Sequence, residues 1–238
     1  MSHIFRFLGH RHNESTTKWF LDQNEIEHVR KALKLKLNDR IEVIDGRGHV
    51  ATGVIESSSR DGITVNCPDV AFTSKSNLTV GIAIGALKPS DFENLLPDIV
   101  ECDVDEIFVF QQDETAKFRT NDKSIERWNR IILSAVKQSK RAWIPELKVC
   151  QSLQEIIDSS AQYQNRYILD VGGQRTIMDE WATICDHVFA VVGGERGLNE
   201  NELNLLSKHN FTTVRLGKTI LRATTAAVAI SAILSAKK

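Results

Sequence analysis

The stretch RLGKTILRATTAAVAI, at residues 215–230, places Gly217, Lys218 and Thr219 between a β-branched run and an alanine-rich run. A Gly-Lys-Thr triplet closes the P-loop, whose backbone amides and Lys hold nucleotide phosphates. A P-loop also needs a second Gly five positions before Gly217, where this chain has Thr212. The spacing therefore argues against a phosphate site and leaves open which ligand the loop binds.

The residues before this stretch alternate between strand-like and helix-like segments. Short, nearly continuous apolar runs are typical of strands buried on both faces. They occupy residues 78–84, 106–110, 166–171, 187–192 and 211–215. The candidate helices are residues 91–101, 123–140, 153–159, 199–208 and 224–236. This alternation predicts an α/β domain with a mostly parallel sheet and helices on both faces.

Three loops that follow predicted strands carry glycine. They read GGQR at residues 172–175, GGERGL at 193–198 and LGKT at 216–219. Ligands of parallel sheets bind beyond the carboxyl ends of the strands, and glycine lets a ligand approach the backbone closely. Asn199 and Glu202 predict a capping box after the second loop. No loop continues as G-x-G-x-x-G with a later acid, so a dinucleotide site is not supported.

The first third of the chain has a different pattern. Residues 28–72 contain short β-branched runs separated by Asp-Gly and Arg-Gly turns, which is typical of hairpins in a small barrel. Apolar residues at near-helical spacing between 26 and 37 predict a helix before these strands. The small polar residues at 72–77 indicate a linker. We therefore expect two domains, at residues 1–73 and 74–238.

Charge is balanced overall but unevenly distributed. The formal net charge is -1, which argues against a uniformly basic nucleic-acid binder. Residues 89–114 contain nine acids and no base, whereas residues 117–148 contain nine bases, and five bases with no acid follow Thr212. Single charges of this kind serve solubility, but two basic stretches in one chain favour a polyanionic partner.

Other function classes lack support in the sequence. The four cysteines have no C-x-x-C pair and are predicted to be reduced core thiols, and the seven histidines show no metal-ligand spacing, so no metal is expected. The first twenty residues lack the apolar segment of a secretory signal, and the longest apolar run is too short to cross a bilayer. We expect a cytoplasmic protein without a membrane partner.

Four segments, in the right order, resemble the RsmE-type 16S ribosomal RNA uracil-N3 methyltransferases of the SPOUT superfamily. HVRKALKLKLNDRIEVIDGRG at residues 28–48 resembles the opening domain of that family. ERWNRIILSAVKQSKRAWIPEL at 126–147 is similar to its RW-RI…A-EQS-R…-P segment. VVGGERGLNENEL at 191–203 stands where the family has IGPEGG-S--E, and LGKTILRATTA at 216–226 stands where it has LG-RILR-ETA.

The resemblance implies an architecture and an activity. It implies a PUA-like β-barrel followed by a SPOUT-type α/β knot, in which a parallel sheet carries a C-terminal trefoil knot. It implies a homodimer that transfers a methyl group from S-adenosyl-L-methionine to N3 of one uridine in 16S rRNA, uridine 1498 in the family, on the RNA or the small ribosomal subunit. The implied cofactor-binding residues are Leu169, Gly172, Val192, Gly193, Gly194, Glu195, Leu216, Gly217, Ile220, Leu221 and Thr225.

Methylation at uracil N3 requires loss of the imide proton while the base is held in line with the methyl group. Arg222 is the predicted catalytic residue, because a guanidinium beside O2 or O4 stabilises the developing negative charge. The alternative is an Arg paired with a carboxylate or an RNA phosphate. The base stays unassigned: Glu195, hydroxide or a water chain are all open.

Some positions depart from the family pattern. Thr224 stands where the family has Glu, Gly194 replaces a Pro, and Arg196 replaces a Gly. These changes leave two other functions open, a catalytically impaired RNA-binding assembly factor and a SPOUT methyltransferase with another RNA target.

Contacts to RNA are expected from both domains, as two basic clusters. The predicted RNA-binding residues are Arg6, Arg11, Arg30, Lys34, Lys137, Lys140 and Arg141. Phosphate contacts of this kind supply affinity with little sequence information, so binding is expected to fall steeply with salt.

Overall fold

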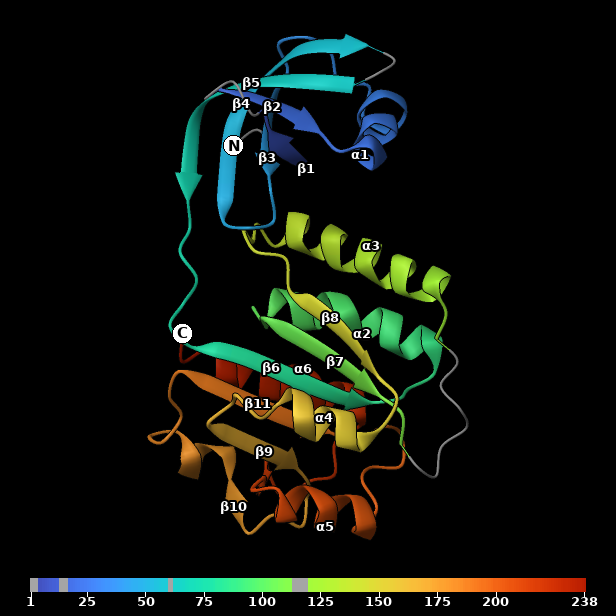
Figure 1. Cartoon of the computed structure of the whole chain (residues 1–238), viewed down its shortest axis with the longest axis vertical. Helices are drawn as coiled ribbons and strands as arrows, with labels where there is room; N and C mark the ends of the chain where they lie inside the picture. The colour runs from blue at the N-terminus through green and yellow to red at the C-terminus, as the bar shows by residue number, and fades with distance from the viewer. Residues whose placement is uncertain (1–3, 13–16, 60–61, 113–119) are drawn as a thin grey trace. The chain divides into compact units, whose positions relative to one another are not determined.

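The structure is a computed structural model that describes residues 4–12, 17–59, 62–112 and 120–238 (Figure 1). The chain divides into two compact units, Met1–Lys75 with Val136–Ile144, and Ser76–Ala135 with Pro145–Lys238. We call them the barrel unit and the sheet unit and describe each by itself. The short segment 136–144 thus clusters with the barrel, far from it in sequence, while 1–73 and 74–238 remain our proposed domain boundaries.

The barrel unit is a closed five-stranded barrel in the order β1-β2-β5-β4-β3. Its strands are β1 (Arg6–Arg11), β2 (Lys18–Leu21), β3 (Arg40–Ile44), β4 (His49–Ser59) and β5 (Gly62–Phe72). Parallel pairing of β1 with β3 closes the barrel, and the other pairs are antiparallel. Alternate residues such as Phe7, Trp19, Ile41 and Val65 fill the interior. The predicted barrel is present, and the sequence reading missed only β1 and β2.

The helix predicted between residues 26 and 37 is shorter than expected. It consists of α1 (Gln23–Glu27) and a π-helical turn, η1 (His28–Ala32). Lys34 then has a φ of 52° and Asn38 a φ of 68°, which no helix can accommodate. Two left-handed residues therefore end the helix in spite of its continuing apolar spacing.

The segment 136–144 is tied to the turn between β3 and β4 by backbone hydrogen bonds. The Gly48 amide donates to the Ala142 carbonyl at 3.1 Å, and the Ile144 amide donates to the Gly46 carbonyl at 3.1 Å. Gly46 and Gly48 have φ values of 71° and 103°, and side chains there would overlap Ile144 and Trp143. The two glycines thus allow the segment to lie directly on the turn.

The sheet unit contains a seven-stranded sheet in the order β10-β12-β9-β11-β6-β7-β8, and every neighbouring pair is parallel. The strands are β6 (Thr79–Gly85), β7 (Glu106–Phe110), β8 (Glu146–Cys150), β9 (Asn165–Leu169), β10 (Arg175–Thr176), β11 (His187–Val192) and β12 (Thr212–Arg215). The predicted parallel sheet is confirmed. The two strands that were not predicted, β8 and β10, lie at its edges.

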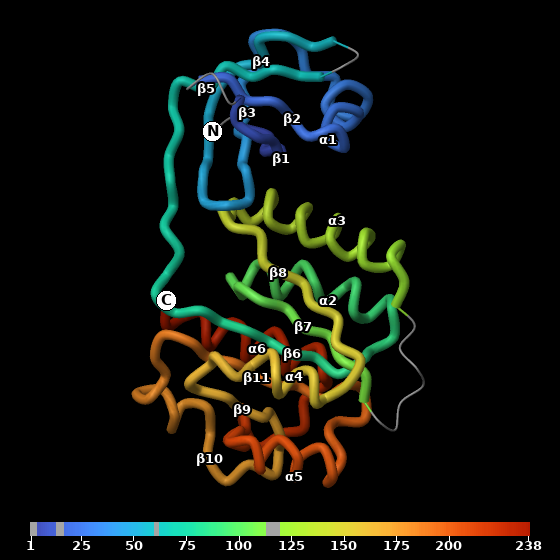
Figure 2. The backbone as a smooth tube through the Cα atoms, in the orientation of Figure 1, coloured from blue at the N-terminus to red at the C-terminus, as the bar shows by residue number. Residues whose placement is uncertain are grey.

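Helices cover both faces of this sheet (Figures 1 and 2). They are α2 (Pro89–Glu101), α3 (Asp122–Gln138), α4 (Leu153–Ser159), α5 (Glu200–Lys208) and α6 (Ala223–Ser235), with a 3-10 turn, η2 (Ile177–Glu180). Ala83, Phe108 and Phe189 point toward α4 and α5, and the intervening strand residues face α2 and α6. Each of the five helices predicted in this unit is present, with ends shifted by no more than two residues.

Candidate functional site

The three glycine-bearing loops come together at one edge of the sheet. Strands β12, β9 and β11 are consecutive neighbours and run parallel, so the loops that follow them share the carboxyl edge. A cavity of about 330 Å³ lies among these loops. It falls within the range of roughly 300–1000 Å³ typical of small-molecule sites.

Most of the residues assigned to a cofactor line this cavity. They are Leu169, Val192, Gly193, Gly194, Glu195, Leu216, Gly217, Ile220 and Leu221. Gly172 and Thr225 are not among the lining residues: Gly172 is exposed and donates its amide to Asp170 Oδ1 at 2.7 Å, and Thr225 is exposed on α6. The structure adds Asp170 and Arg215 to the lining, which no sequence signal marked.

Residues 217–221 form one wall of the cavity, and their backbone groups are not used in hydrogen bonds within the described chain. The side chains of Ile220 and Leu221 are 85% and 38% exposed, although both are apolar. Free amides and carbonyls beside apolar side chains suit a ligand with a flat apolar body and a polar edge.

A buried glutamine holds the glycine-rich loop at 193–198. The side chain of Gln112 accepts a hydrogen bond from the Gly194 amide at 2.7 Å and donates one to the Gly197 carbonyl at 2.9 Å. A side chain at Gly85 would overlap the Gln112 amide oxygen, so glycine is needed where β6 ends. Sequence reasoning missed Gln112, because nothing local distinguishes it from any polar residue after a strand.

The same loop is anchored at its far end by α5. Asn199 Oδ1 accepts from the Glu202 amide, and Glu202 Oε2 accepts from the Asn199 amide, both at 2.9 Å. The predicted capping box is therefore confirmed. Glu202 Oε2 also accepts from Gln112 Nε2 at 3.0 Å, so one buried network fixes both the loop and the start of the helix.

Arg222 is the N-cap residue of α6 and lies at the rim of the cavity. Its side chain is exposed and forms no hydrogen bond or ion pair with any residue that the structure describes. Arg222 and Glu195 also line a neighbouring cavity of about 550 Å³, whose opposite side is formed by Asp91 and other residues of α2. One alternative role for Arg222 was an ion pair with a carboxylate of the same chain. Among the described residues, no carboxylate pairs with it.

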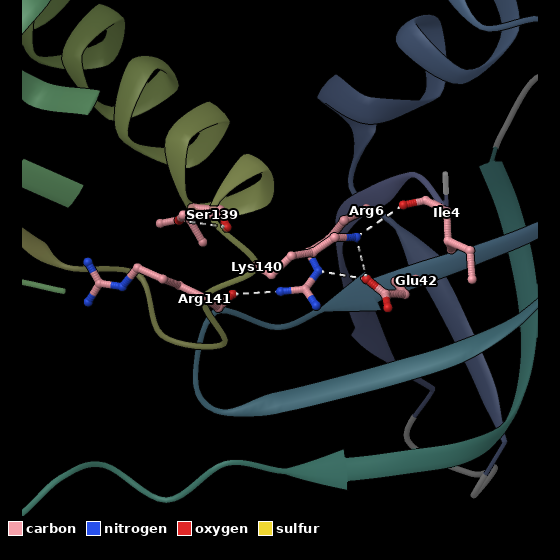
Figure 3. Close-up of polar contacts among 7 residues, drawn as sticks. Ile4, Arg6, Glu42, Ser139, Lys140 and Arg141 are labelled. Carbon is pink, nitrogen blue, oxygen red and sulfur yellow. Dashed lines mark hydrogen bonds and ion pairs between the residues drawn. The ribbon is translucent and has the colours of Figure 1, made fainter. Parts of the chain in front are cut away.

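Several basic residues assigned to RNA are engaged inside the barrel unit instead. Arg6 Nε donates to Glu42 Oε2 at 2.9 Å and its Nη1 to the Arg141 carbonyl at 3.0 Å, and the Arg6 side chain is only 6% exposed (Figure 3). Lys140 Nζ donates to Glu42 Oε2 at 3.0 Å and to the Ile4 carbonyl at 3.1 Å. The side chain of Arg141 points away from Arg6 (Figure 3).

These contacts change the acidity of the carboxylate that they share. Burial alone would raise the pKa of Glu42, but hydrogen bonds from Lys140 and Arg6 and their positive charges outweigh it and lower that pKa. Glu42 therefore stays ionised and joins the segment that carries Lys140 to strands β1 and β3.

Of the other basic residues predicted to contact RNA, two bond to groups within the barrel unit and two have exposed side chains. Lys137 Nζ pairs with the buried Glu25 at 2.7 Å, and Arg30 bonds to Ser58 Oγ at 3.3 Å and to the Ser59 carbonyl. Arg11 and Lys34 have exposed side chains. Two bases of the charged stretch, Lys117 and Arg119, lie outside the described residues.

A cavity of about 550 Å³ in the barrel unit is lined by further basic residues. Its lining includes Arg11 and Arg47, together with His10 and His49. His49 Nδ1 lies 2.7 Å from Asp45, and His10 Nδ1 lies 3.3 Å from Asp22, which also lines the cavity. Arg47 was not among the residues predicted from sequence.

The cysteines differ from the expectation in part. Cys67 and Cys150 are buried thiols, as predicted, and burial raises their pKa values to about 12 and about 11. The expectation is wrong for Cys185, which is exposed just before β11.

No group of three His, Cys, Asp or Glu in the described ranges is placed to hold a metal ion. Across the same ranges, no helix combines the length and apolarity that a bilayer crossing requires.

Both units match known protein families. Residues 74–235 match the RNA methyltransferase domain and residues 21–66 match the RNA methyltransferase PUA domain. The chain thus has the architecture of a class of RNA-modifying enzymes. A small barrel is followed by a parallel sheet, and the loops at the carboxyl edge of the sheet enclose a cavity of the size of a small ligand. The chain belongs to this RNA methyltransferase family.

Relatives within the family carry one recurring name. Ribosomal RNA small subunit methyltransferase E of Mycobacterium bovis is 28% identical over 231 residues, which are 90% of this chain and 84% of that protein. The crystal structure of ribosomal RNA small subunit methyltransferase E from Neisseria gonorrhoeae, bound to S-adenosyl methionine, has a TM-score of 0.87 at 24% identity and covers 99% of this chain and 98% of its own.

A second solved structure agrees with the first. The probable rRNA-methyltransferase from Porphyromonas gingivalis has a TM-score of 0.82 at 26% identity, with 98% of this chain and 99% of the other covered. The resemblance to the RsmE-type methyltransferases is confirmed by these matches, as is the expected fold class, a PUA-like barrel followed in the chain by an α/β methyltransferase domain with a parallel sheet.

Proposed function

We propose that the protein transfers a methyl group from S-adenosylmethionine to N3 of one uridine in 16S rRNA. The observation that carries the proposal is the cavity at the ends of β9, β11 and β12, with unbonded backbone along residues 217–221 and Arg222 at its rim. The relative from N. gonorrhoeae, which shares this fold, is described with S-adenosyl methionine bound.

The residues present fit this cofactor. Leu169, Val192 and Leu216 supply apolar surface for a purine, and the free amides and carbonyls of 217–221 can hydrogen-bond its edge. The charged lining is mixed, with two carboxylates and three arginines, and the loops lack the spacing of a P-loop, which argues against a phosphorylated ligand. S-adenosylmethionine supplies an electrophilic methyl group when bound.

The role proposed for Arg222 follows from its lack of a partner in the described part of the chain. An unpaired guanidinium at the rim is available to hydrogen-bond a uracil carbonyl and stabilise the imide anion. We also propose that the enzyme acts in the cytoplasm on 16S rRNA or the small ribosomal subunit, as a homodimer. Since Ile230 and Leu234 are already buried within the sheet unit, sedimentation at low micromolar concentration is the test of the dimer.

The proposed function is tested on ribosomal RNA from cells that lack the gene. Purified protein, S-adenosylmethionine and small subunits from those cells should yield 3-methyluridine, detected by mass spectrometry of nucleosides. Another methylated nucleoside would establish a different target. Cofactor binding without any methylated nucleoside would favour the assembly factor.

Replacing Arg222 with Ala should lower turnover at least 100-fold, the usual cost of removing one donor to a developing oxyanion. Calorimetry should show S-adenosylmethionine affinity changed less than about threefold, because the cofactor is bound by backbone and apolar groups. Lys218→Ala, in the same loop but outside the cavity lining, is the matched control and should behave as wild type. An active Arg222→Ala enzyme would refute the assignment.

A further inference from the structure

The second cavity of the sheet unit lies beside the proposed cofactor site and shares two charged residues with it. Its volume is about 550 Å³, and Arg222 and Glu195 line both cavities. The remaining charged lining comes from α2 and its N-cap, namely Asp91, Asp98 and Lys88. The Arg222 guanidinium could therefore contact both a ligand in this cavity and a methyl donor bound in the proposed cofactor site.

The charges around this cavity are not equivalent. Lys88 Nζ and Glu195 Oε2 are 3.6 Å apart and neutralise one another, and Asp98 is exposed. Asp91 is half-buried in the first turn of α2, and its carboxylate makes no hydrogen bond or ion pair within the described chain. Asp91 and Arg222 are thus opposite charges that line one cavity, each without a partner among the residues that the structure describes.

An arrangement of this kind leaves both groups available to a ligand. The first turn of α2 favours a carboxylate, and the oxygens of Asp91, which accept no hydrogen bond from a described residue, remain free to accept one from a ligand. A neutral imide, with an N–H flanked by two carbonyls, offers a donor to the carboxylate and an acceptor to the guanidinium. Uracil presents that pattern along its N3 edge.

We propose that this cavity receives the target base and that Asp91 is the general base of the reaction. The inference rests on the proposed function and names the residue left unassigned there. The Asp91 carboxylate accepts the N3 proton while Arg222 donates to an adjacent carbonyl. The freed N3 electron pair forms the new N–C bond, the methyl–sulfur bond breaks with its electrons going to sulfur, and Asp91 returns its proton to water.

The chemistry is within the reach of a carboxylate. A general base contributes about 10²–10⁴ in rate, and an Asp with a modestly raised pKa removes carbon-bound protons in ketosteroid isomerase. The base must be turned out of an RNA stack to enter the cavity, as enzymes that act on single bases require. Thr224, which also lines this cavity and replaces the family's Glu, brings no carboxylate of its own.

The first test is single-turnover methylation by Asp91→Asn across pH. The rate should fall at least 100-fold at pH 7, and the deficit should shrink tenfold per pH unit as solvent hydroxide replaces the carboxylate. Asp91→Glu should restore part of the rate. Glu101→Gln, an exposed position on the same helix, is the control. The titratable and charged groups that share the cavity with Asp91 are Lys88, Asp98, Glu195 and Arg222.

The second test is a binding measurement without turnover. With S-adenosylhomocysteine present, wild-type protein should bind unmethylated small subunits about tenfold more tightly than Asp91→Asn does, the effect of one charge-assisted hydrogen bond. Subunits already methylated at N3 have no proton to donate, so wild type and Asp91→Asn should bind them equally.

The outcomes separate this inference from the proposed function. An Asp91→Asn enzyme that keeps the wild-type rate and pH profile, while wild type makes 3-methyluridine, overturns the role of Asp91 alone. A wild-type protein that methylates no RNA overturns both proposals. Unchanged circular dichroism and cofactor affinity in Asp91→Asn would show that a lost rate does not reflect misfolding.

Discussion

Charged side chains in this protein divide into those that hold the barrel unit together and those that are free to meet a ligand. Arg6, Lys140 and Glu42 form the first kind, with two cations on one carboxylate oxygen. Arg222 forms the second kind, since no described residue pairs with it. A basic residue in the sequence is therefore an RNA contact only where the fold leaves it unpaired.

Glu42→Gln should destabilise the protein by roughly 2 kcal/mol at pH 7, because charge-assisted hydrogen bonds are lost and Arg6 remains buried. The folded-state pKa of Glu42 is lowered, so its contribution is present above the unfolded-state pKa of about 4.3 and is lost as pH falls through the folded value. Urea unfolding should show the difference from wild type narrowing below about pH 4. Glu126→Gln, exposed on α3 without a described partner, should change stability little at either pH.

Among the structural elements, the glycine-rich loop at 193–198 shows most clearly how a binding surface is held. Gly197 has a φ of 73°, and its amide donates to the Gly194 carbonyl at 3.0 Å, which closes a tight turn. Gln112 bonds to the backbone at both ends of that turn. The loop therefore depends on a side chain from the end of a different strand, β7.

Gln112→Ala should weaken S-adenosylmethionine binding about tenfold, because the Gly194 amide and the Gly197 carbonyl lose buried partners and the loop loses its fixed shape. Isothermal calorimetry measures the effect. Gln154→Ala removes a hydrogen bond of an exposed Gln on α4 and should leave cofactor affinity unchanged. Unchanged affinity in Gln112→Ala would mean that the loop holds its shape without this side chain.

The elements that the sequence did not reveal share a physical cause. Strand β8 lies at the sheet edge and carries Glu146 and Lys148 among its five residues, so it lacks the continuous apolar run of a central strand. Strand β10 has only two residues. Strands β1 and β2 contain Arg6, Arg11 and Lys18, whose charges obscured the alternating apolar pattern.

At the scale of the whole molecule, recognition of a large polyanion by a nearly neutral chain depends on where unpaired bases remain. In the barrel unit, Arg47 lines one cavity, and Lys34 and Lys36 are exposed beyond η1; the side chains of these three pair with no residue that the structure describes. These residues, rather than Arg6 or Lys140, are the ones that we propose to meet phosphates. The proposed patch is thus smaller than the basic content of the sequence suggested.

RNA affinity should fall roughly 100-fold between about 50 and 200 mM salt, as expected for a few phosphate contacts. Lys34→Ala should reduce the slope of log K against log salt by about 1, whereas Lys31→Ala, already paired with Glu27, should reduce it less. Filter binding with 16S rRNA measures both. A flat salt dependence would show that phosphate contacts do not supply the affinity.

The sequence by itself determined the α/β class, the parallel sheet, five of the helices and the positions of three glycine-bearing loops. Each of these depends on the period of apolar residues and on turn and cap residues within short windows. Only the tertiary structure decided that the loops after β9, β11 and β12 are neighbours, because strand order is not chain order. It also decided the partners of Gln112 and Arg6 and placed Asp91 in the same cavity as Arg222, since hydrogen bonds and burial join residues that no local pattern connects.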